Sequence, residues 1–497
     1  MIWILVSVAA VLLLIYDRLK FRHWTKRGVP HLTPIPFFGH YHPVAFGLQP
    51  PGMFYDCHLQ KHKDKKYFGV YEYHRPTLVL NDLDLVEHVL VKDFSSFANH
   101  PRWVIDESSY LNQMTLNLRG NLWRATRYRL TPSFTASKMQ LALDRILRIA
   151  SPNFQEGEFE LQDKMSAIAA DVIASYFGAT IQNKDAFAQA MFEQTYTSPI
   201  RHVEYQFLEH FPKLAAWSGM SLFSKKIDKT MRETSRALLS GCGATSEFRS
   251  LIEGIKSDGV LRMKGKDFDI NGNEEADHVF EATDELLLGQ ASQFLFAGLD
   301  ATANTMGFLA YEIAANLDVQ AKVRAEVTAA LAKHGNQWSY EMLHELTYLQ
   351  NCVQESMRIH SVKPFLFREA TRDYTFPGTN LKIKTGEKVV IPAISFQMDP
   401  QHYPEPEKFK PERWSEDARP KSKFTWLPFG EGPRQCLGMR FSIMEMKLVL
   451  GKLLTEFEMT ISPRTAMPAG HVTLGIVGRL DRPVYVRLNR LNSGKTS

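Results

Sequence analysis

The sequence predicts a mainly helical protein with small β-sheets. Long amphipathic stretches at 135–150, 160–178 and 320–334 carry apolar residues at helical spacing. Strand signals are short: Tyr67–Tyr71 and Thr77–Leu80 alternate around a turn, which is typical of a hairpin. The 497 residues, of which 44% are hydrophobic, suffice for a large core, and length alone suggests two or three domains.

The chain begins with an almost unbroken apolar run from Ile2 to Tyr16. As a helix this run extends about 22 Å, which is shorter than the ~27 Å hydrocarbon core of the endoplasmic reticulum membrane. A cleaved signal peptide is the alternative, but no basic segment precedes the run, and its one small-x-small site lies inside it. Basic residues follow the run and predict a cytoplasmic side by the positive-inside rule: Arg18, Lys20, Arg22, Lys26 and Arg27.

We therefore predict an uncleaved transmembrane anchor at 1–17, a basic and proline-rich linker at 18–36, and a globular domain at 37–497. The net charge of +5 is mild, so no nucleic-acid partner is expected. Four cysteines show neither a paired metal spacing nor a disulfide framework, which fits a reducing compartment. They are Cys57, Cys242, Cys352 and Cys436.

The most informative stretch surrounds Cys436, which comes just before a helix-like run at 439–454. Unpaired amide groups and the helix dipole at that position favour a thiolate. Gly432 and Gly438 suit a tight loop that lets a flat ligand approach the backbone. A lone cysteine is more often simply a buried residue. Here, however, Phe429 offers an aromatic face near the sulfur, and Arg434 offers a guanidinium group for a carboxylate.

The pattern Phe-x-x-Gly-x-Arg-x-Cys-x-Gly at 429–438 resembles the haem-binding loop of the cytochrome P450 family. The resemblance covers about residues 30–490 and is closest to animal microsomal members that oxidise xenobiotics. It implies one large, mostly helical catalytic domain of the cytochrome P450 fold. It also implies haem b as cofactor, with Cys436 as the iron ligand and Arg434, Phe429 and Gly438 beside the haem.

Further motifs occur in the family's order. Trp123 and Arg127 lie one helical turn apart, and in the family the matching pair holds a haem propionate, as does the residue matching Arg368. Glu355 and Arg358 could form a simple surface ion pair. The resemblance implies instead a buried network that Arg413 completes and that sets the cysteine loop against the core.

The stretch from Phe294 to Met306 is the expected catalytic helix. Ala297 leaves room for a ligand against the helix, and Asp300 places a carboxylate in an apolar segment. The family's pattern continues with a threonine that orders the proton supply for O–O bond cleavage, but here that position is Ala301. Thr302 follows about 100° further around the helix, so it replaces the missing hydroxyl only in part.

The resemblance implies a membrane-bound monooxygenase that inserts one oxygen atom from O₂ into a small apolar substrate. Electrons come from NADPH through NADPH–cytochrome P450 reductase, with cytochrome b5 as a further candidate partner. The catalytic domain is expected on the cytoplasmic side of the endoplasmic reticulum membrane. Ala301 keeps two alternatives open, a haem-thiolate peroxide isomerase and a non-catalytic haem-binding protein.

The sequence also suggests a membrane-contacting segment, a docking patch and the walls of a substrate pocket. Phe207–Lys226 is either ordinary core or a loop that dips into membrane lipid. A basic patch is expected to dock the reductase, and it consists of Arg124, Arg129, Lys421, Lys423, Arg440 and Lys447. The candidate walls of the substrate pocket are largely apolar, namely 101–118, 207–211, 294–302, 362–367 and 472–475.

Overall fold

The structure is a computed structural model that describes residues 2–101, 109–177, 199–220, 224–241, 259–263, 278–472 and 477–491. Its α-helices are α1 (Ile2–Lys20), α2 (His23–Lys26), α3 (His42–Ala45), α4 (Pro51–Gln60), α5 (Leu83–Glu87), α6 (Gly120–Leu130), α7 (Ala136–Asn153), α8 (Leu161–Tyr176), α10 (Pro199–His210), α11 (Pro212–Trp217), α12 (Lys225–Gly241), α14 (Asp284–Phe296), α15 (Thr302–Ala315), α16 (Leu317–Lys333), α17 (Tyr340–Glu345), α18 (Thr347–Ile359), α19 (Ala393–Gln397) and α20 (Met439–Glu456). Its strands are β1 (Tyr67–Glu72), β2 (Arg75–Leu80), β3 (Gly157–Glu160), β4 (Val260–Met263), β5 (His278–Glu281), β6 (Leu366–Glu369), β7 (Tyr374–Thr375), β8 (Lys382–Ile383), β9 (Lys388–Ile391), β10 (Phe457–Ile461), β11 (His471–Val472), β12 (Arg479–Leu480) and β13 (Tyr485–Arg490).

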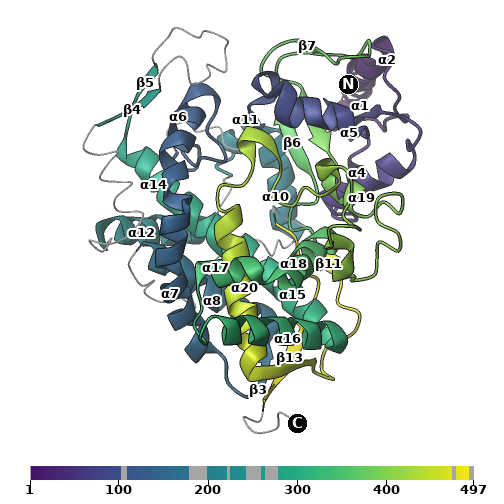
Figure 1. Ribbon diagram of the computed structural model, residues 1–497. Coiled ribbons are helices and arrows are strands. Elements are labelled where there is room, and N and C mark those ends of the chain that lie inside the picture. The colour runs from purple at the N-terminus through teal and green to yellow at the C-terminus, as the bar shows by residue number, and fades with distance from the viewer. Residues whose placement is uncertain are drawn as a thin grey trace.

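Helices dominate the larger part of the molecule, where α7, α8, α15, α16 and α20 pack together (Figure 1). In α7 the buried side chains recur at helical spacing, at Met139, Leu143, Ile146 and Ala150. This stripe faces the main hydrophobic cluster and explains why the segment is a helix. The three helices predicted at 135–150, 160–178 and 320–334 are confirmed as α7, α8 and α16.

A four-stranded sheet in the order β1-β2-β9-β6 forms the smaller part. β1 and β2 are the predicted hairpin, which is confirmed, and β9 pairs parallel to β2 and antiparallel to β6. Along the strands alternate residues belong to different hydrophobic clusters: Leu78 and Leu80 face one cluster, and Val79 faces the other. Because both faces are covered, the sheet is a rigid support for the loops that leave β6 and β9.

The N-terminal segment lies beside this sheet (Figure 1). Trp24 is buried and donates its indole N–H to the carbonyl oxygen of Val70 at 3.0 Å, while Arg27 pairs with Glu387 at 2.8 Å. This part of the predicted linker is therefore packed on the domain, because a buried indole with a bonded N–H stabilises the contact. Within the described part of the chain, we find no helix whose length and apolar character would let it cross a membrane.

Candidate functional site

Cys436 lies at the end of a tight loop that leads into α20. Its amide donates to the carbonyl oxygen of Phe429 at 2.9 Å. Gly432 has a positive φ of 76°, and a Cβ there would lie 1.9 Å from the carbonyl oxygen of Leu90. Gly432 therefore allows the loop to pack on neighbouring backbone, whereas Gly438 lines the cavity beside Cys436.

Cys436 lines a cavity of the protein, and its side chain is accessible there. Burial raises the pKa of its thiol, although the backbone N–H of Gly438 and the guanidinium of Arg127 oppose this effect. The prediction that the start of the helix favours a thiolate is thus wrong for the protein alone, because burial penalises the charged form more strongly. A metal ion bound to the sulfur would deprotonate it outright.

Three arginines line the same cavity. Arg434 donates to the carbonyl oxygens of Ala98, Thr115 and Leu118 at 2.8–3.1 Å, and its guanidinium lies 3.9 Å from the centroid of the Trp123 ring. These bonds fix the guanidinium without neutralising its charge. Burial, together with Arg368, Arg127 and Arg119, lowers the pKa of Arg434.

No acidic side chain on the described cavity wall balances the charges of this arginine cluster (Arg127, Arg368 and Arg434). Arg368 is 3% exposed, and its Nε has no partner among the described residues. Burial lowers the pKa of Arg368 to about 10. Among the described residues no aspartate or glutamate lines the cavity. The chemistry of the cluster therefore suits carboxylate groups of a bound ligand.

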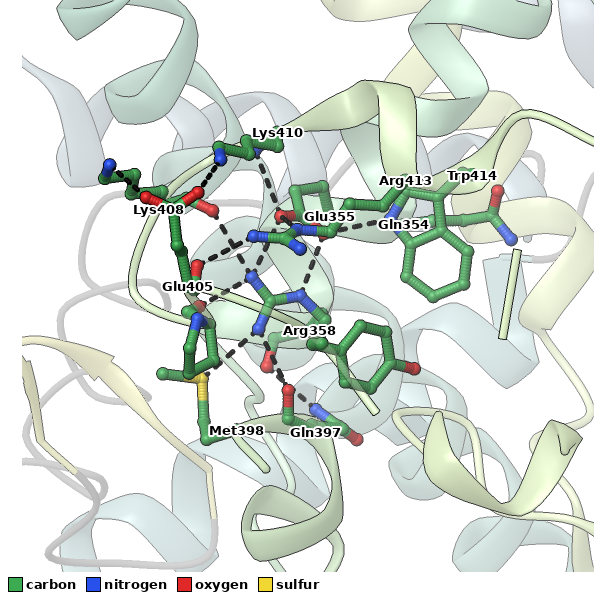
Figure 2. Close-up of polar contacts among 12 residues, drawn as sticks. Gln354, Glu355, Arg358, Gln397, Met398, Glu405, Lys408, Lys410, Arg413 and Trp414 are labelled. Carbon is green, nitrogen blue, oxygen red and sulfur yellow. Dashed lines mark hydrogen bonds and ion pairs between the residues drawn. The ribbon is translucent and has the colours of Figure 1, made fainter. Parts of the chain in front are cut away.

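The predicted network around Glu355 is present and buried (Figure 2). Arg358 donates to both carboxylate oxygens of Glu355 at 2.9 Å, and Arg413 adds a third contact at 3.1 Å. The indole N–H of Trp414 and the backbone N–H of Lys410 also donate to this carboxylate, each at 3.0 Å. Both oxygens are thus fully used, which is what a buried charge requires.

This network is connected to the cysteine loop through one glutamine. Arg358 donates to the backbone oxygen of Gln397 at 2.9 Å. The side chain of Gln397 donates to the backbone oxygen of Arg358 at 3.0 Å and accepts from the amide of Leu427 at 3.2 Å. Because Leu427 comes two residues before Phe429, the network fixes the start of the loop that carries Cys436.

On the helical wall, α14 and α15 are joined by a π-helical turn, η5 (Ala297–Ala301). Ala301 and Thr302 both line the cavity. The hydroxyl of Thr305 donates to the carbonyl oxygen of Ala301 at 2.8 Å, so this hydroxyl is already engaged. Such single π-turns are common at functional sites, and here the turn brings two successive residues to the cavity.

Asp300 lies behind this wall and does not line the cavity. Asn304 donates to Oδ1 of Asp300 at 2.9 Å, and Oδ2 has no partner among the described residues. Burial raises the pKa of Asp300 to about 6, although Arg479 and Asn304 oppose the rise. A carboxyl that titrates near neutrality can take up and release protons at physiological pH.

The cavity has a volume of about 370 Å³ and brings together nine of the ten predicted site residues. The exception is Asp300, and the nine are Trp123, Arg127, Ala297, Thr302, Arg368, Phe429, Arg434, Cys436 and Gly438. Apolar side chains that the motifs did not identify complete the wall, for example Phe134, Ile173, Tyr176 and Phe441. Their segments are amphipathic helices or short turns, which the sequence does not orient toward a cavity.

The predicted pocket walls are correct in part. Residues from 294–302 and 362–367 line the cavity, as do Thr115 and Leu116 from the first predicted wall. Residues 102–108 and 473–476 lie outside the described residues. The segment 207–211 is not part of the wall, because the Phe211 ring packs instead on other aromatic side chains of the sheet region.

The prediction that Lys447 belongs to an exposed docking patch is wrong. Lys447 is only 5% exposed, since α20 is buried on nearly all sides, and burial lowers its pKa to about 8. Lys421, Lys423 and Arg440 are exposed, and Arg124 and Arg129 are half-buried. The exposed basic surface is therefore smaller than the sequence suggests.

Comparison with known proteins decides the family. The model of the family described as "Cytochrome P450" matches residues 29–484. The chain belongs to the cytochrome P450 family. It is 30% identical to cytochrome P450 6a2 of Drosophila melanogaster, over 99% of each chain. It is also 30% identical to cytochrome P450 6B1 of Papilio polyxenes, over 98% of this chain and 99% of that protein. This cytochrome P450 is a haem-binding monooxygenase of mostly helical fold, as its motifs predict.

The cavity residues fit a haem. The Cys436 thiol offers a metal ligand, the arginine cluster offers charge for propionates, and the buried Arg368 Nε still lacks an acceptor among the described residues. Phe429 and Gly438 add an aromatic and a backbone surface on the side of the thiol.

Proposed function

We propose that this cytochrome P450 binds haem b through Cys436 and oxidises small apolar substrates with electrons from NADPH–cytochrome P450 reductase. When bound, the haem supplies the activation of O₂, from which one oxygen atom enters the substrate. The observation that carries the proposal is that Cys436 and the arginine cluster share one cavity whose remaining wall is chiefly apolar. The residues of the chain hold the cofactor, exclude water and manage protons.

The arginine cluster and Trp123 would bind the two propionates. Arg434 is pre-oriented by three carbonyl groups and by the Trp123 ring, so little side-chain freedom is lost on binding. Arg127 and Arg368 supply further donors. Carboxylates placed here would relieve the mutual repulsion of the guanidinium groups, which favours binding beyond simple hydrogen bonding.

Asp300 and Thr302 would handle protons on the helical wall. Asp300 titrates near neutrality and lies behind the wall, whereas Thr302 lies on it. We propose that Asp300 passes protons inward and that the Thr302 hydroxyl orders water at the cavity. Ala301 has no hydroxyl, so the position that performs this task in the family pattern contributes only shape.

Membrane association is proposed from an exposed apolar surface around the N-terminus. Tyr16 of α1 lies 5.3 Å from His74 between ring centroids, Phe37 lies 5.8 Å from the same ring, and Phe37 stacks on Phe211 just before α11. Large apolar side chains of these segments face solvent: Trp3, Ile4, Leu12, Leu19, Phe46, Leu48, Leu214 and Trp217. Exposed apolar side chains on segments that contact one another support binding to the endoplasmic reticulum membrane.

The same proposal places the catalytic domain on the cytoplasmic side, with residues 1–17 as the anchor and basic residues after it. A xenobiotic-oxidising role and a second electron donor, cytochrome b5, belong to this proposal as well. The exposed Lys421, Lys423 and Arg440 would contribute to docking the reductase.

The decisive experiment is substitution of the proposed ligand. Cys436→Ser should abolish the absorption band of the reduced, carbon monoxide-bound haem-thiolate protein. Cys57→Ser and Cys352→Ser should keep it, since Cys57 is exposed at the surface and Cys352 is buried in the core apart from the cavity. Loss of the band in either control with haem still bound would assign the ligand elsewhere.

A further inference from the structure

Lys363 is the one lysine among the described residues that line the cavity. It lies between α18 and β6, in a segment with a well-fixed backbone. Gly478 donates to the carbonyl oxygen of Val362 at 2.9 Å, and Ile394 donates to that of Pro364 at 2.8 Å. Pro364 also packs so closely on Gly52 that a Cβ there would lie 2.7 Å from the proline ring. The segment therefore presents Lys363 to the cavity from a rigid support.

The ammonium group of Lys363 has no hydrogen bond or ion pair with any described residue. Its Nζ lies 5.4 Å from the centroid of the Phe367 ring. Burial lowers the pKa of Lys363 to about 8, and the charge of Glu209 partly opposes this effect. At neutral pH the side chain is still mostly charged.

Lys388 is a buried lysine whose ammonium group has a structural role, and its partners provide a comparison with Lys363. Lys388 is 2% exposed, and its Nζ contacts Glu72 at 2.8 Å and Glu209 at 2.9 Å. Two carboxylates thus balance one buried charge, as expected for a group that serves stability. Lys363 is partly exposed and lines the cavity, and it has no such ion pair with any described residue.

The haem carboxylates do not account for this charge. The arginine cluster already provides three guanidinium groups for the two carboxylates of a haem. No described acidic side chain lines the cavity to pair with the ammonium group. A fourth positive charge on the cavity wall, that of Lys363, therefore remains for the substrate.

We propose that Lys363 binds the carboxylate of the substrate, so that this monooxygenase acts on apolar molecules that carry one carboxylate group, such as medium-chain and long-chain fatty acids. The inference rests on the proposed function, since it names the substrate class of the same cavity. A carboxylate on the ammonium group forms a charge-assisted hydrogen bond where water is scarce. The aromatic and aliphatic wall takes the chain, with Ile173, Phe294 and Phe296.

Binding of dodecanoate and of its neutral methyl ester to the haem-loaded protein tests this inference. Calorimetry and the haem absorption change should both report tighter binding of the acid by the wild type. A hydrogen bond to a charged group contributes about 1.5–3 kcal/mol, which corresponds to roughly 10- to 100-fold in affinity. Lys363→Met keeps the side-chain length, and it should weaken dodecanoate binding by about this factor while the ester changes little.

Two further variants make the result specific. Lys363→Arg should retain the preference for the acid, because it keeps the positive charge. Lys61→Met removes one positive charge from an exposed position, and it should leave both affinities unchanged. Equal wild-type affinities for acid and ester would overturn the inference, as would an equal loss of both in Lys363→Met.

The carbon monoxide band separates this inference from the proposed function. If Lys363→Met loses haem, the lysine serves the haem propionates and the inference is wrong. If the wild type itself lacks the thiolate band, the proposed function fails instead. An intact band with no discrimination between acid and ester rejects only the assignment of the substrate class.

Discussion

The cysteine side and the helical side of the cavity differ in how fully their buried polar groups are paired. On the cysteine side, five donors fill the two oxygens of Glu355. On the helical side, Asp300 accepts a side-chain bond at one oxygen, and its other oxygen has no partner among the described residues. Both carboxylates are buried, so the difference does not come from exposure.

This difference in pairing indicates a structural role for Glu355 and a role in proton transfer for Asp300. A carboxylate that is held by two guanidinium groups fixes the geometry of its surroundings, which suits the support of the Cys436 loop. A carboxylate with few partners in an apolar helix is poised between its charged and neutral forms. The first should matter for folding and haem retention, and the second for pH dependence and turnover.

The largest effect is expected on the fully paired side. Glu355→Ala leaves Arg358 and Arg413 buried without their carboxylate, which should lower the free energy of unfolding by about 3–5 kcal/mol. The Cys436 loop should also lose its support, so haem occupancy should fall. Urea unfolding and haem content per protein measure both effects.

Glu412→Ala is the matched control, since Glu412 belongs to the same short segment as Arg413. Its ion pair with Lys322 at 2.8 Å is exposed, with 54% and 56% of the two side chains accessible. Such a pair contributes about 0–1 kcal/mol. Equal losses in the two variants would mean that burial of the Glu355 network adds nothing.

The next effect is expected on the sparsely paired side and has the opposite sign. Asp300→Asn removes a carboxylate whose pKa burial raises to about 6, so the variant should be more stable at neutral pH. Below pH ~4 the carboxyl is neutral in both folded and unfolded chains, and it costs nothing. As pH rises toward 6, the unfolded chain ionises first, and the cost grows to roughly 3 kcal/mol above pH 6.

Unfolding measured between pH 5 and pH 8 should therefore show a stability gain for Asp300→Asn that increases up to about pH 7 and then levels off. Asp417→Asn, at an exposed position, should show no such trend. Product formation should fall in Asp300→Asn, because an amide cannot carry protons. A gain that is independent of pH would contradict the proton-linked role.

Much of the cysteine side could be predicted from sequence, because its residues lie in short motifs with fixed spacing. Glu355, Arg358 and Arg413 are confirmed as one buried network. Their roles follow from residue type: a buried carboxylate needs guanidinium partners. Of the four-stranded sheet only the β1–β2 hairpin could be predicted, because its strands are neighbours in sequence, whereas β9 pairs with β2 from a distant segment.

Features that depend on burial could not be predicted. The position of Lys447 on a buried helix face, the packing of Trp24 on the sheet and the unpaired Lys363 all depend on contacts between distant segments. The direction of the pKa change at Cys436 is a further example, because burial outweighs the local helix effect. Sequence shows which groups are present, and only the fold shows which of them lack partners.

The smallest effect should be at Ala301, where the question is coupling and not stability. Ala301 lines the cavity, and Thr305, one turn later, already donates its hydroxyl to the Ala301 carbonyl oxygen. Among the described residues of this helical wall, the Thr302 hydroxyl is therefore the candidate for ordering water near the reaction. The wild type should therefore consume NADPH in excess of product and release hydrogen peroxide.

Ala301→Thr adds a hydroxyl and a methyl group to the cavity wall, so it should raise product per NADPH. Ala297→Thr adds the same atoms one turn earlier and should not, which controls for crowding. If Ala301→Thr leaves product per NADPH unchanged while Thr302→Ala abolishes product, the Thr302 hydroxyl alone orders the water for proton delivery. The helical side would then be as complete for its role as the cysteine side, although fewer of its buried polar groups are paired.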